Sequence, residues 1–280
     1  MIRSLPLLAL LASASVGCAA EQDWLNHERW DEGLAEVCLY TGKQLKYGTL
    51  RDSRLEVITV REHFDPERLV KTRPAPGKAV IRILKQNVVR ETRTGVYEYN
   101  QMASVFLDRD TGETVKLSAV SMEWCGNSHV LFEAAHGDEP AALTIANYMD
   151  DRGTTRTTLE PNAVPLFDEA LIPYLRQNLD RINKGDTLPT ARPLADNNPV
   201  FRRAPRTVKA VRRTQETVDI VLEGQGATET FTFANSALRR LKKWRNDRGE
   251  EYTLQKVLFL DYWNRNRPGD AKLLPEAFQD

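Results

Sequence analysis

Strand-like runs joined by short turns rich in Asp, Asn and Gly constrain the fold of this chain most strongly. The clearest example is residues 95–132, where two long β-type runs flank the turn Asp110-Thr111-Gly112. Similar turns occur at residues 150–153, 223–226 and 246–249. Gly and Asn accept the positive φ angles that hairpin turns require. The sequence therefore predicts a series of antiparallel hairpins.

One segment departs from this pattern. Between residues 164 and 182, apolar residues recur at spacings of three and four, which is typical of a helix with one buried face; they are Phe167, Leu171, Tyr174, Leu175, Leu179 and Ile182. Pro173 lies inside this stretch and predicts either a kink or two helices in series. The Pro-rich residues 186–206 that follow predict a long irregular crossover.

The order of these segments indicates the fold class. Strands do not alternate with helices, which argues against a parallel α/β sheet. Several runs are apolar on both faces, as in residues 114–124. We therefore expect a mainly β protein with minor α content, in which a large curved antiparallel sheet, or half-barrel, wraps around the mid-chain helix.

The N-terminus has the pattern of a secretory signal. Arg3 precedes the apolar residues 5–14, and small residues follow. This apolar run is too short to span a bilayer, which takes roughly 20 residues. Ser15-Val16-Gly17-Cys18 resembles a bacterial lipobox, in which cleavage before Cys18 exposes it for lipidation. Ordinary cleavage sites at residues 12–14 and 18–20 are the alternatives. We expect an exported protein, anchored at the outer membrane through Cys18 or otherwise periplasmic.

These features divide the chain into four parts. Residues 1–17 are expected to form the signal peptide, and residues 18–32 the anchor and a lead-in that docks onto the domain through two tryptophans. Residues 33–262 are expected to form a single antiparallel β domain with a helix at 164–182. Residues 263–280 remain as a C-terminal tail.

Charge gives little support to a nucleic-acid partner. The chain has 39 basic and 39 acidic residues, whereas nucleic-acid-binding proteins usually carry a basic excess. Two basic clusters are expected to lie on solvated strand faces, with anionic lipid headgroups as the alternative contact; they are Arg202, Arg203, Arg206, Lys209, Arg212 and Arg213, and Arg239, Arg240, Lys242, Lys243 and Arg245.

The two remaining cysteines suggest a disulfide. Export favours pairing, so Cys38 and Cys125 are predicted to bridge. The alternative is that Cys125 and His129 form a thiolate–imidazolium pair in a cysteine-dependent envelope enzyme. Glu123, His129 and His136 lack the spacing of a metal site, and we predict neither a metal nor a cofactor. The sequence also lacks a nucleophile elbow, a phosphate loop and a dinucleotide-binding motif.

A resemblance adds to this interpretation. The chain resembles uncharacterised exported bacterial proteins with a lipoprotein-carrier (LolA/LolB-like) half-barrel. The features that carry the resemblance are the antiparallel meanders, the Asp/Gly hairpins, a mid-chain helix ending near Gly185-Asp186 and a last hairpin around residues 244–258. The resemblance implies an open concave sheet able to hold an acyl chain or another hydrophobic ligand. We therefore expect an exported lipoprotein that binds a hydrophobic or lipid ligand, or an envelope protein partner.

Overall fold

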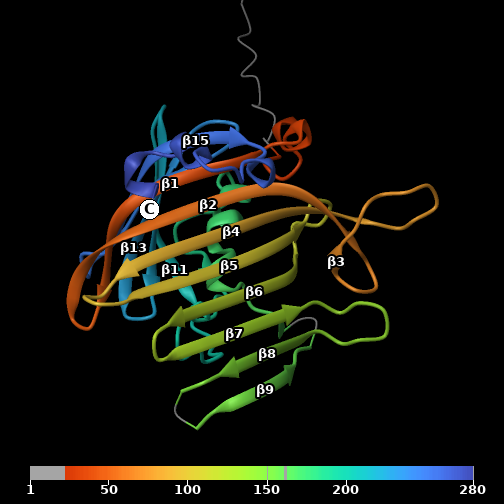
Figure 1. The fold of residues 1–280 in the computed structure, drawn as a ribbon, viewed down its shortest axis with the longest axis horizontal. Helices are drawn as coiled ribbons and strands as arrows, with labels where there is room; N and C mark the ends of the chain where they lie inside the picture. Colours follow the sequence, from red (N-terminus) through yellow and green to blue (C-terminus); the bar gives the residue numbers. More distant parts are fainter. Residues whose placement is uncertain (1–22, 150, 161–162, 280) are drawn as a thin grey trace, which may run out of the picture.

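The computed structural model describes residues 23–149, 151–160 and 163–279. In this part of the chain, fifteen strands form one antiparallel sheet that curves around a single short α-helix, which confirms the predicted fold class (Figure 1). The strands run in the order β10-β11-β12-β13-β14-β15-β1-β2-β4-β5-β6-β7-β8-β9, and β3 pairs with β2. Their bounds are β1 Ala35–Lys46, β2 Thr49–Asp65, β3 Val70–Lys71, β4 Ile81–Arg93, β5 Glu98–Asp108, β6 Thr114–Glu123, β7 Gly126–Glu133, β8 Ala142–Asn147, β9 Gly153–Thr158, β10 Thr187–Leu188, β11 Arg206–Arg213, β12 Thr217–Gly224, β13 Ala227–Ala234, β14 Leu241–Asn246 and β15 Glu251–Leu260.

Strand β1 lies near the middle of the sheet because it pairs with β2 on one side and with β15 on the other. It is covered on both faces. Cys38 and Tyr40 face the helix, while Val37 and Leu39 face a C-terminal segment that includes Phe278. This arrangement explains why the strand is apolar at consecutive positions. Residues 263–279 consist mostly of short 3-10 turns, and Phe278 anchors them to the sheet.

The helix is shorter than the apolar pattern suggested. A 3-10 turn at Asp168–Ala170 precedes α1 (Leu171–Gln177), and Pro173 lies in its first turn. Asn178 follows the last helical residue as its C-cap, and its side-chain amide donates to the Tyr174 carbonyl at 2.9 Å. The predicted helix at 164–182 is therefore wrong in extent. The periodic residues Leu179 and Ile182 still join the core around α1, but from the turns that follow it.

The sheet curves because both of its halves pack on α1. Apolar side chains of β1 and β2, such as Leu55 and Val57, contact the same cluster as Val208, Ile220 and Phe233 from β11–β13. The helix therefore lies between the central strands and the late strands. This enclosure leaves the concave side of the sheet as an inner surface.

Part of the crossover at residues 186–206 closes over this inner surface. Buried polar side chains of β5, β7 and β8 bind this part of the crossover. Gln101 of β5 donates to the Ala195 carbonyl at 2.7 Å, and Asn147 of β8 donates to Asn198 Oδ1 at 2.7 Å. Ser128 of β7 donates to the Asp196 carbonyl. We call residues 194–199 the strap. It forms one wall of the site described below.

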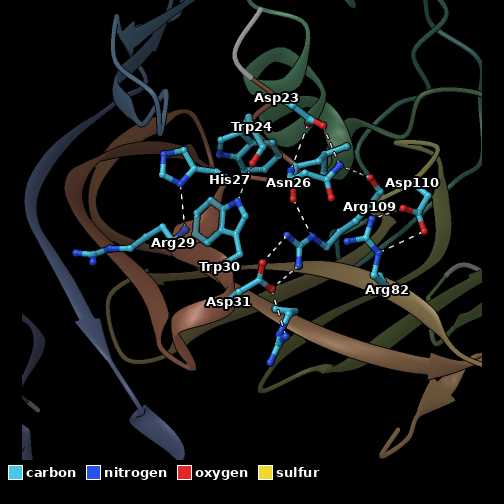
Figure 2. Close-up of polar contacts among 12 residues, drawn as sticks. Asp23, Trp24, Asn26, His27, Arg29, Trp30, Asp31, Arg82, Arg109 and Asp110 are labelled. Atoms are coloured by element: carbon cyan, nitrogen blue, oxygen red, sulfur yellow. Dashed lines mark hydrogen bonds and ion pairs between the residues drawn. The ribbon is translucent and has the colours of Figure 1, made fainter. Parts of the chain in front are cut away.

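Residues 23–32, the described part of the lead-in, pack into the core (Figure 2). Trp24 and Trp30 are buried and meet edge to face, with ring centroids 5.8 Å apart. Arg109 is also buried; its Nε donates to the Leu25 carbonyl at 2.9 Å, and its Nη1 donates to Asp31 Oδ1 at 2.9 Å. The segment is therefore fixed by aromatic packing and by one buried arginine.

A buried ion cluster joins α1 to the sheet. Glu36 of β1 is fully buried and accepts from Arg176 of α1 at 2.9 Å and from Arg240 at 2.6 Å. Arg239 is also buried and pairs with Asp180. The expectation that the two basic clusters lie on solvated faces is therefore wrong for Arg206 and Arg239, because both are enclosed and matched by carboxylates. Among the described residues, no helix has both the length and the apolar character to cross a membrane.

Candidate functional site

A cavity of about 410 Å³ lies on the inner surface of the sheet, next to α1 and the strap. Strands from both halves of the sheet line it, together with residues 168–172 and the strap residues Ala195 and Asp196. Its volume lies within the range typical of small-molecule sites, about 300–1,000 Å³. The cavity is the strongest candidate for a functional site because its lining combines apolar side chains with several charged ones.

The floor of the cavity is apolar. Its lining side chains come from β2, β4, β13, β14 and α1: Leu55, Val88, Phe231, Leu241, Leu171 and Ile172. The aromatic rings of Trp244 and Tyr252 stand at 5.9 Å from one another and extend this surface. An apolar body of a ligand would be buried here with a gain of about 25 cal/mol per Å² of apolar surface.

One end of the cavity is acidic. Arg206 is buried there, pairs with Asp168, and donates from Nε to Glu229 Oε2 at 2.8 Å. Burial raises the pKa of Glu229, and the nearby charge of Arg206 opposes this rise. Arg206 Nη1 is buried without a hydrogen-bond partner in the described part of the chain. Two acidic neighbours thus fix the guanidinium, and one of its N–H groups remains unused.

Glu169 lies beside this end and is only half satisfied. Its Oε1 accepts from the backbone N–H groups of Leu194 and Ala195 at 2.5 Å and 2.9 Å, which ties α1 to the strap. Its Oε2 is buried and has no partner among residues 23–149, 151–160 and 163–279. Burial, and then the charge of Asp168, raise the pKa of Glu169 to about 7.

The stability of the protein is expected to fall as the pH rises from about 4.5 to about 7, by roughly 3 kcal/mol from this group. The folded-state pKa of Glu169 is raised from 4.5 to about 7, so the folded state favours the protonated carboxyl. This contribution is complete below pH 4.5 and is lost as the pH passes through 7. Urea unfolding between pH 4.5 and 8 measures it.

Glu169→Gln is the control for this dependence, because its amide oxygen can accept the same two backbone bonds without titrating. The variant should show a flatter decline of unfolding free energy over the same pH range. An unchanged decline in the variant would mean that other groups, such as Glu229, are responsible.

Two further cations, Lys46 and Arg90, line the cavity, and so do the carboxyl groups of Asp196 and Glu250. The Lys46 ammonium lies 4.5 Å from the centre of the Tyr99 ring, and the Arg90 guanidinium lies 5.7 Å from that of Tyr252. Burial lowers the pKa of Lys46, while Asp196 raises it and Arg90 lowers it further. Within the part of the chain that the structure describes, Arg90 Nε is buried without a hydrogen-bond partner.

Cys125 and His129 do not form an activated pair. Cys125 is exposed in the turn between β6 and β7. The Nε2 atom of His129 lies 3.4 Å from Ser118 Oγ, which is a hydrogen-bond distance. A hydrogen bond to the Glu123 carboxylate, together with its charge, raises the pKa of the Cys125 thiol. A catalytic cysteine requires the opposite shift. Trp124, beside it, is 77% exposed.

The predicted disulfide between Cys38 and Cys125 is absent, and both residues are free thiols. Cys38 lies in β1, and three strands, β2, β4 and β5, separate β1 from β6. At about 4.8 Å per strand, this places the cysteines roughly 19 Å apart across the sheet, far beyond bonding range. Sequence alone could not reveal this separation because it depends on strand order.

In the folded protein, alkylating reagents should modify Cys125 and leave Cys38 intact. Cys38 is buried, and burial followed by the charge of Glu36 raises the pKa of its thiol to about 12. Peptide mass mapping after iodoacetamide treatment, with and without denaturant, measures both sites. Rapid labelling of Cys38 without denaturant would show that β1 is not enclosed as described.

Other predicted site residues are separate from the cavity. Cys18, the predicted lipidation site, lies outside the described residues. Glu123, His129 and His136 make no joint site; within the described ranges, no group of three His, Cys, Asp or Glu side chains is arranged to hold a metal ion. Tyr97 and Tyr99 join Tyr47, whose hydroxyl lies 2.9 Å and 2.5 Å from theirs, where β1 and β2 and also β4 and β5 turn into one another.

Sequence reasoning missed the cavity residues themselves. Arg90 and Gln101 stand directly opposite one another on β4 and β5, and both belong to the face that elsewhere carries Val88 and Ala103. A polar residue on an otherwise apolar strand face was the available signal. It pointed to an inner site, but it could not indicate which other strands complete that site.

Comparison with known proteins assigns no role to this chain. No family model matches the chain, and no curated protein matches it. Among solved structures, the chain is similar to a β-barrel-like protein of the domain of unknown function DUF1849 from Brucella abortus. The TM-score is 0.47 at 8% identity, over 81% of this chain and 98% of that one. This similarity assigns no function to any residue.

Proposed function

We propose that this protein is an exported binding protein that holds a small amphipathic molecule in the cavity beside α1. The observation that carries the proposal is a cavity with an apolar floor and with the charged side chains of Lys46, Arg90, Glu169 and Arg206 in its lining. A ligand with an apolar body and a polar head would cover the floor and pair with these charged groups.

The mixed walls favour this ligand over a purely hydrophobic one. Lys46, Arg90, Glu169 and Arg206 all line the cavity. A ligand consisting only of hydrocarbon would displace water from these groups without replacing its hydrogen bonds, which is costly. The resemblance led us to expect a hydrophobic ligand, and we now propose that this ligand also carries a polar head.

Binding of an environment-sensitive naphthalene dye tests the proposal. Val88→Trp fills part of the floor and should weaken dye binding at least tenfold. Val96→Trp is the matched control, since Val96 is 81% exposed in a turn, and its affinity should equal that of the wild type. Equal affinities for the three proteins would place the dye elsewhere and contradict the proposal.

Export and anchoring through Cys18 are part of the same proposal. The signal-like N-terminus and the cysteine that follows it support this. Metabolic labelling with a fatty-acid precursor should tag the wild-type protein and leave Cys18→Ala unlabelled. Equal labelling of both, or of neither, would contradict anchoring at this residue.

A further inference from the structure

The most exposed large apolar side chains gather at one end of the sheet. Among the described residues, the four with the highest exposed fractions are Tyr47, Val96, Trp124 and Tyr148, at 67%, 81%, 77% and 66%. The first three lie in the β1–β2, β4–β5 and β6–β7 turns, and Tyr148 directly follows β8. Because successive connections of an antiparallel sheet alternate between its ends, all four lie at the same end, on the left of Figure 1.

These side chains form one continuous surface. The ring centroid of Tyr97 lies 6.0 Å from that of Trp124, and the hydroxyls of Tyr97 and Tyr47 are 2.9 Å apart. The Tyr148 ring packs over Gly126, where an added Cβ would meet it at 2.6 Å, so Tyr148 lies against the turn that carries Trp124. We call Tyr47, Val96, Tyr97, Trp124 and Tyr148 the apolar rim.

The turns at the opposite end of the sheet differ in character. The β5–β6 turn carries Asp110-Thr111-Gly112, and the β7–β8 connection includes Gly137-Asp138-Glu139. The lead-in also lies at that end, where Arg109 donates to the Leu25 carbonyl. The apolar rim is therefore not a general property of the hairpins, and its contacts do not depend on the anchor proposed at Cys18.

The composition of the rim suits a lipid–water interface. Tyr and Trp bury an apolar ring while their O–H or N–H group stays in water, which is why they concentrate at membrane interfaces. Two charged groups beside the rim are already engaged: Arg93 pairs with Glu98 at 2.5 Å, and the Glu123 carboxylate accepts from the Cys125 N–H at 2.6 Å. Contact through the rim would thus rest on apolar burial more than on anionic headgroups.

The cavity reaches the same end of the sheet. Lys46, which precedes Tyr47, lines it, and so do Gln225 of the β12–β13 turn and Arg248 of the β14–β15 turn. Arg248 is exposed, so the cavity lining continues to the surface there. The Lys46 ammonium also lies over the ring of Tyr99, whose hydroxyl is 2.5 Å from that of Tyr47. The rim and the cavity lining are therefore in contact.

We propose that the apolar rim docks onto the surface of a lipid bilayer, with its side chains at the boundary between headgroups and acyl chains. Docking in this orientation turns the Arg248 end of the cavity toward the bilayer. The inference deepens the proposed function, since amphipathic molecules partition into bilayers and the cavity would meet its ligand there. The rim itself would bind a bilayer whether or not the cavity is filled.

A fluorescent label on Cys125 tests docking at the rim. Cys125 is exposed beside Trp124, Cys38 is buried, and Cys18→Ala in the full chain removes the third cysteine. With phosphatidylcholine vesicles, the emission of a nitrobenzoxadiazole label should rise and shift to shorter wavelength, and phosphatidylcholine spin-labelled on its acyl chains should quench it. The same label at Thr111→Cys, made with Cys125→Ser, is exposed at the opposite end and should not respond.

A double variant tests the rim side chains. Trp124→Ser with Tyr148→Ser should raise the lipid concentration for half-maximal response at least about tenfold, because it removes much of the apolar area available for burial. The control is Trp263→Ser, which removes a 46% exposed Trp from a 3-10 turn of the C-terminal segment and should bind vesicles like the wild type.

The outcomes separate this inference from its rivals. No response at Cys125, or an equal response at position 111, would overturn docking through the rim. A concentration-dependent dimer in sedimentation, lost in the double variant and without any vesicle response, would overturn it in favour of a second copy of this chain. If docking fails while Val88→Trp still weakens dye binding in the cavity, the proposed function stands without it. If docking is observed while Val88→Trp changes nothing, the rim inference holds and the proposed function fails.

Discussion

Replacing Glu36 with Gln is expected to lower the free energy of unfolding by about 3–5 kcal/mol. Glu36 is fully buried and neutralises both Arg176 and Arg240, so the substitution leaves two guanidinium groups without their carboxylate. Arg176 is itself buried and cannot turn to solvent. Because a domain is stable by only about 5–15 kcal/mol, this single change would remove a large share of the total. Urea or guanidinium unfolding measures the loss.

The matched control is Asp52→Asn, which breaks the exposed ion pair between Lys43 and Asp52 on the adjoining hairpin. Exposed pairs contribute about 0.2–1 kcal/mol, so this variant should unfold close to the wild type. Equal losses for Glu36→Gln and Asp52→Asn would mean that water reaches Glu36 and that the buried cluster does not hold α1 to the sheet.

Replacing Trp24 with Ala is expected to cost about 3–5 kcal/mol, in the range of large-to-small core substitutions. Trp24 has no exposed surface, packs edge to face on Trp30, and lies under the Arg176 guanidinium at 4.4 Å. Its loss would open a cavity beneath the lead-in. Since Arg176 contacts both Trp24 and Glu36, the double variant should deviate from additivity.

Trp124→Ala removes an equally large side chain from a position that is 77% exposed, and it should change stability by less than about 0.5 kcal/mol. Chemical unfolding of both variants gives the comparison. A small effect of Trp24→Ala, equal to that of Trp124→Ala, would show that residues 23–32 are an appendage to the core and not a part of it.

Local turn chemistry made much of the fold predictable from the sequence. Gly112 has a φ of 78° in the β5–β6 turn, and Gly249 has a φ of 85° between β14 and β15, so the residues that signalled hairpins occupy the conformations that favour Gly. In strand β2, the polar residues Arg51 and Asp52 continue the ladder opposite β1 beyond the apolar part of the strand.

Features that depend on distant contacts were not predictable in the same way. The apolar spacing at 164–182 reflected burial correctly, but Leu179 and Ile182 reach the core from turns and not from the helix. Arg206 belonged to a run of basic residues, yet it is enclosed because Asp168 and Glu229 are brought to it from elsewhere in the chain. Composition within a segment does not reveal such partners.

The cavity is a further case of this kind. Two of its cations come from β1 and β4, its acidic end from residues 168–169 and β13, and one wall from the strap. These segments are far apart in the sequence and meet only because β1 lies between β2 and β15. The proposed binding role therefore depends on the closed curvature of the sheet as much as on any single residue.

Native mass spectrometry of protein purified gently from the cells that produce it tests the central claim most directly. The account predicts that the wild type carries a small molecule at one equivalent, and that Val88→Trp, purified in parallel, carries none. A wild-type protein free of any ligand, or equal loading of the wild type and the variant, would contradict the claim that the cavity beside α1 is a binding site.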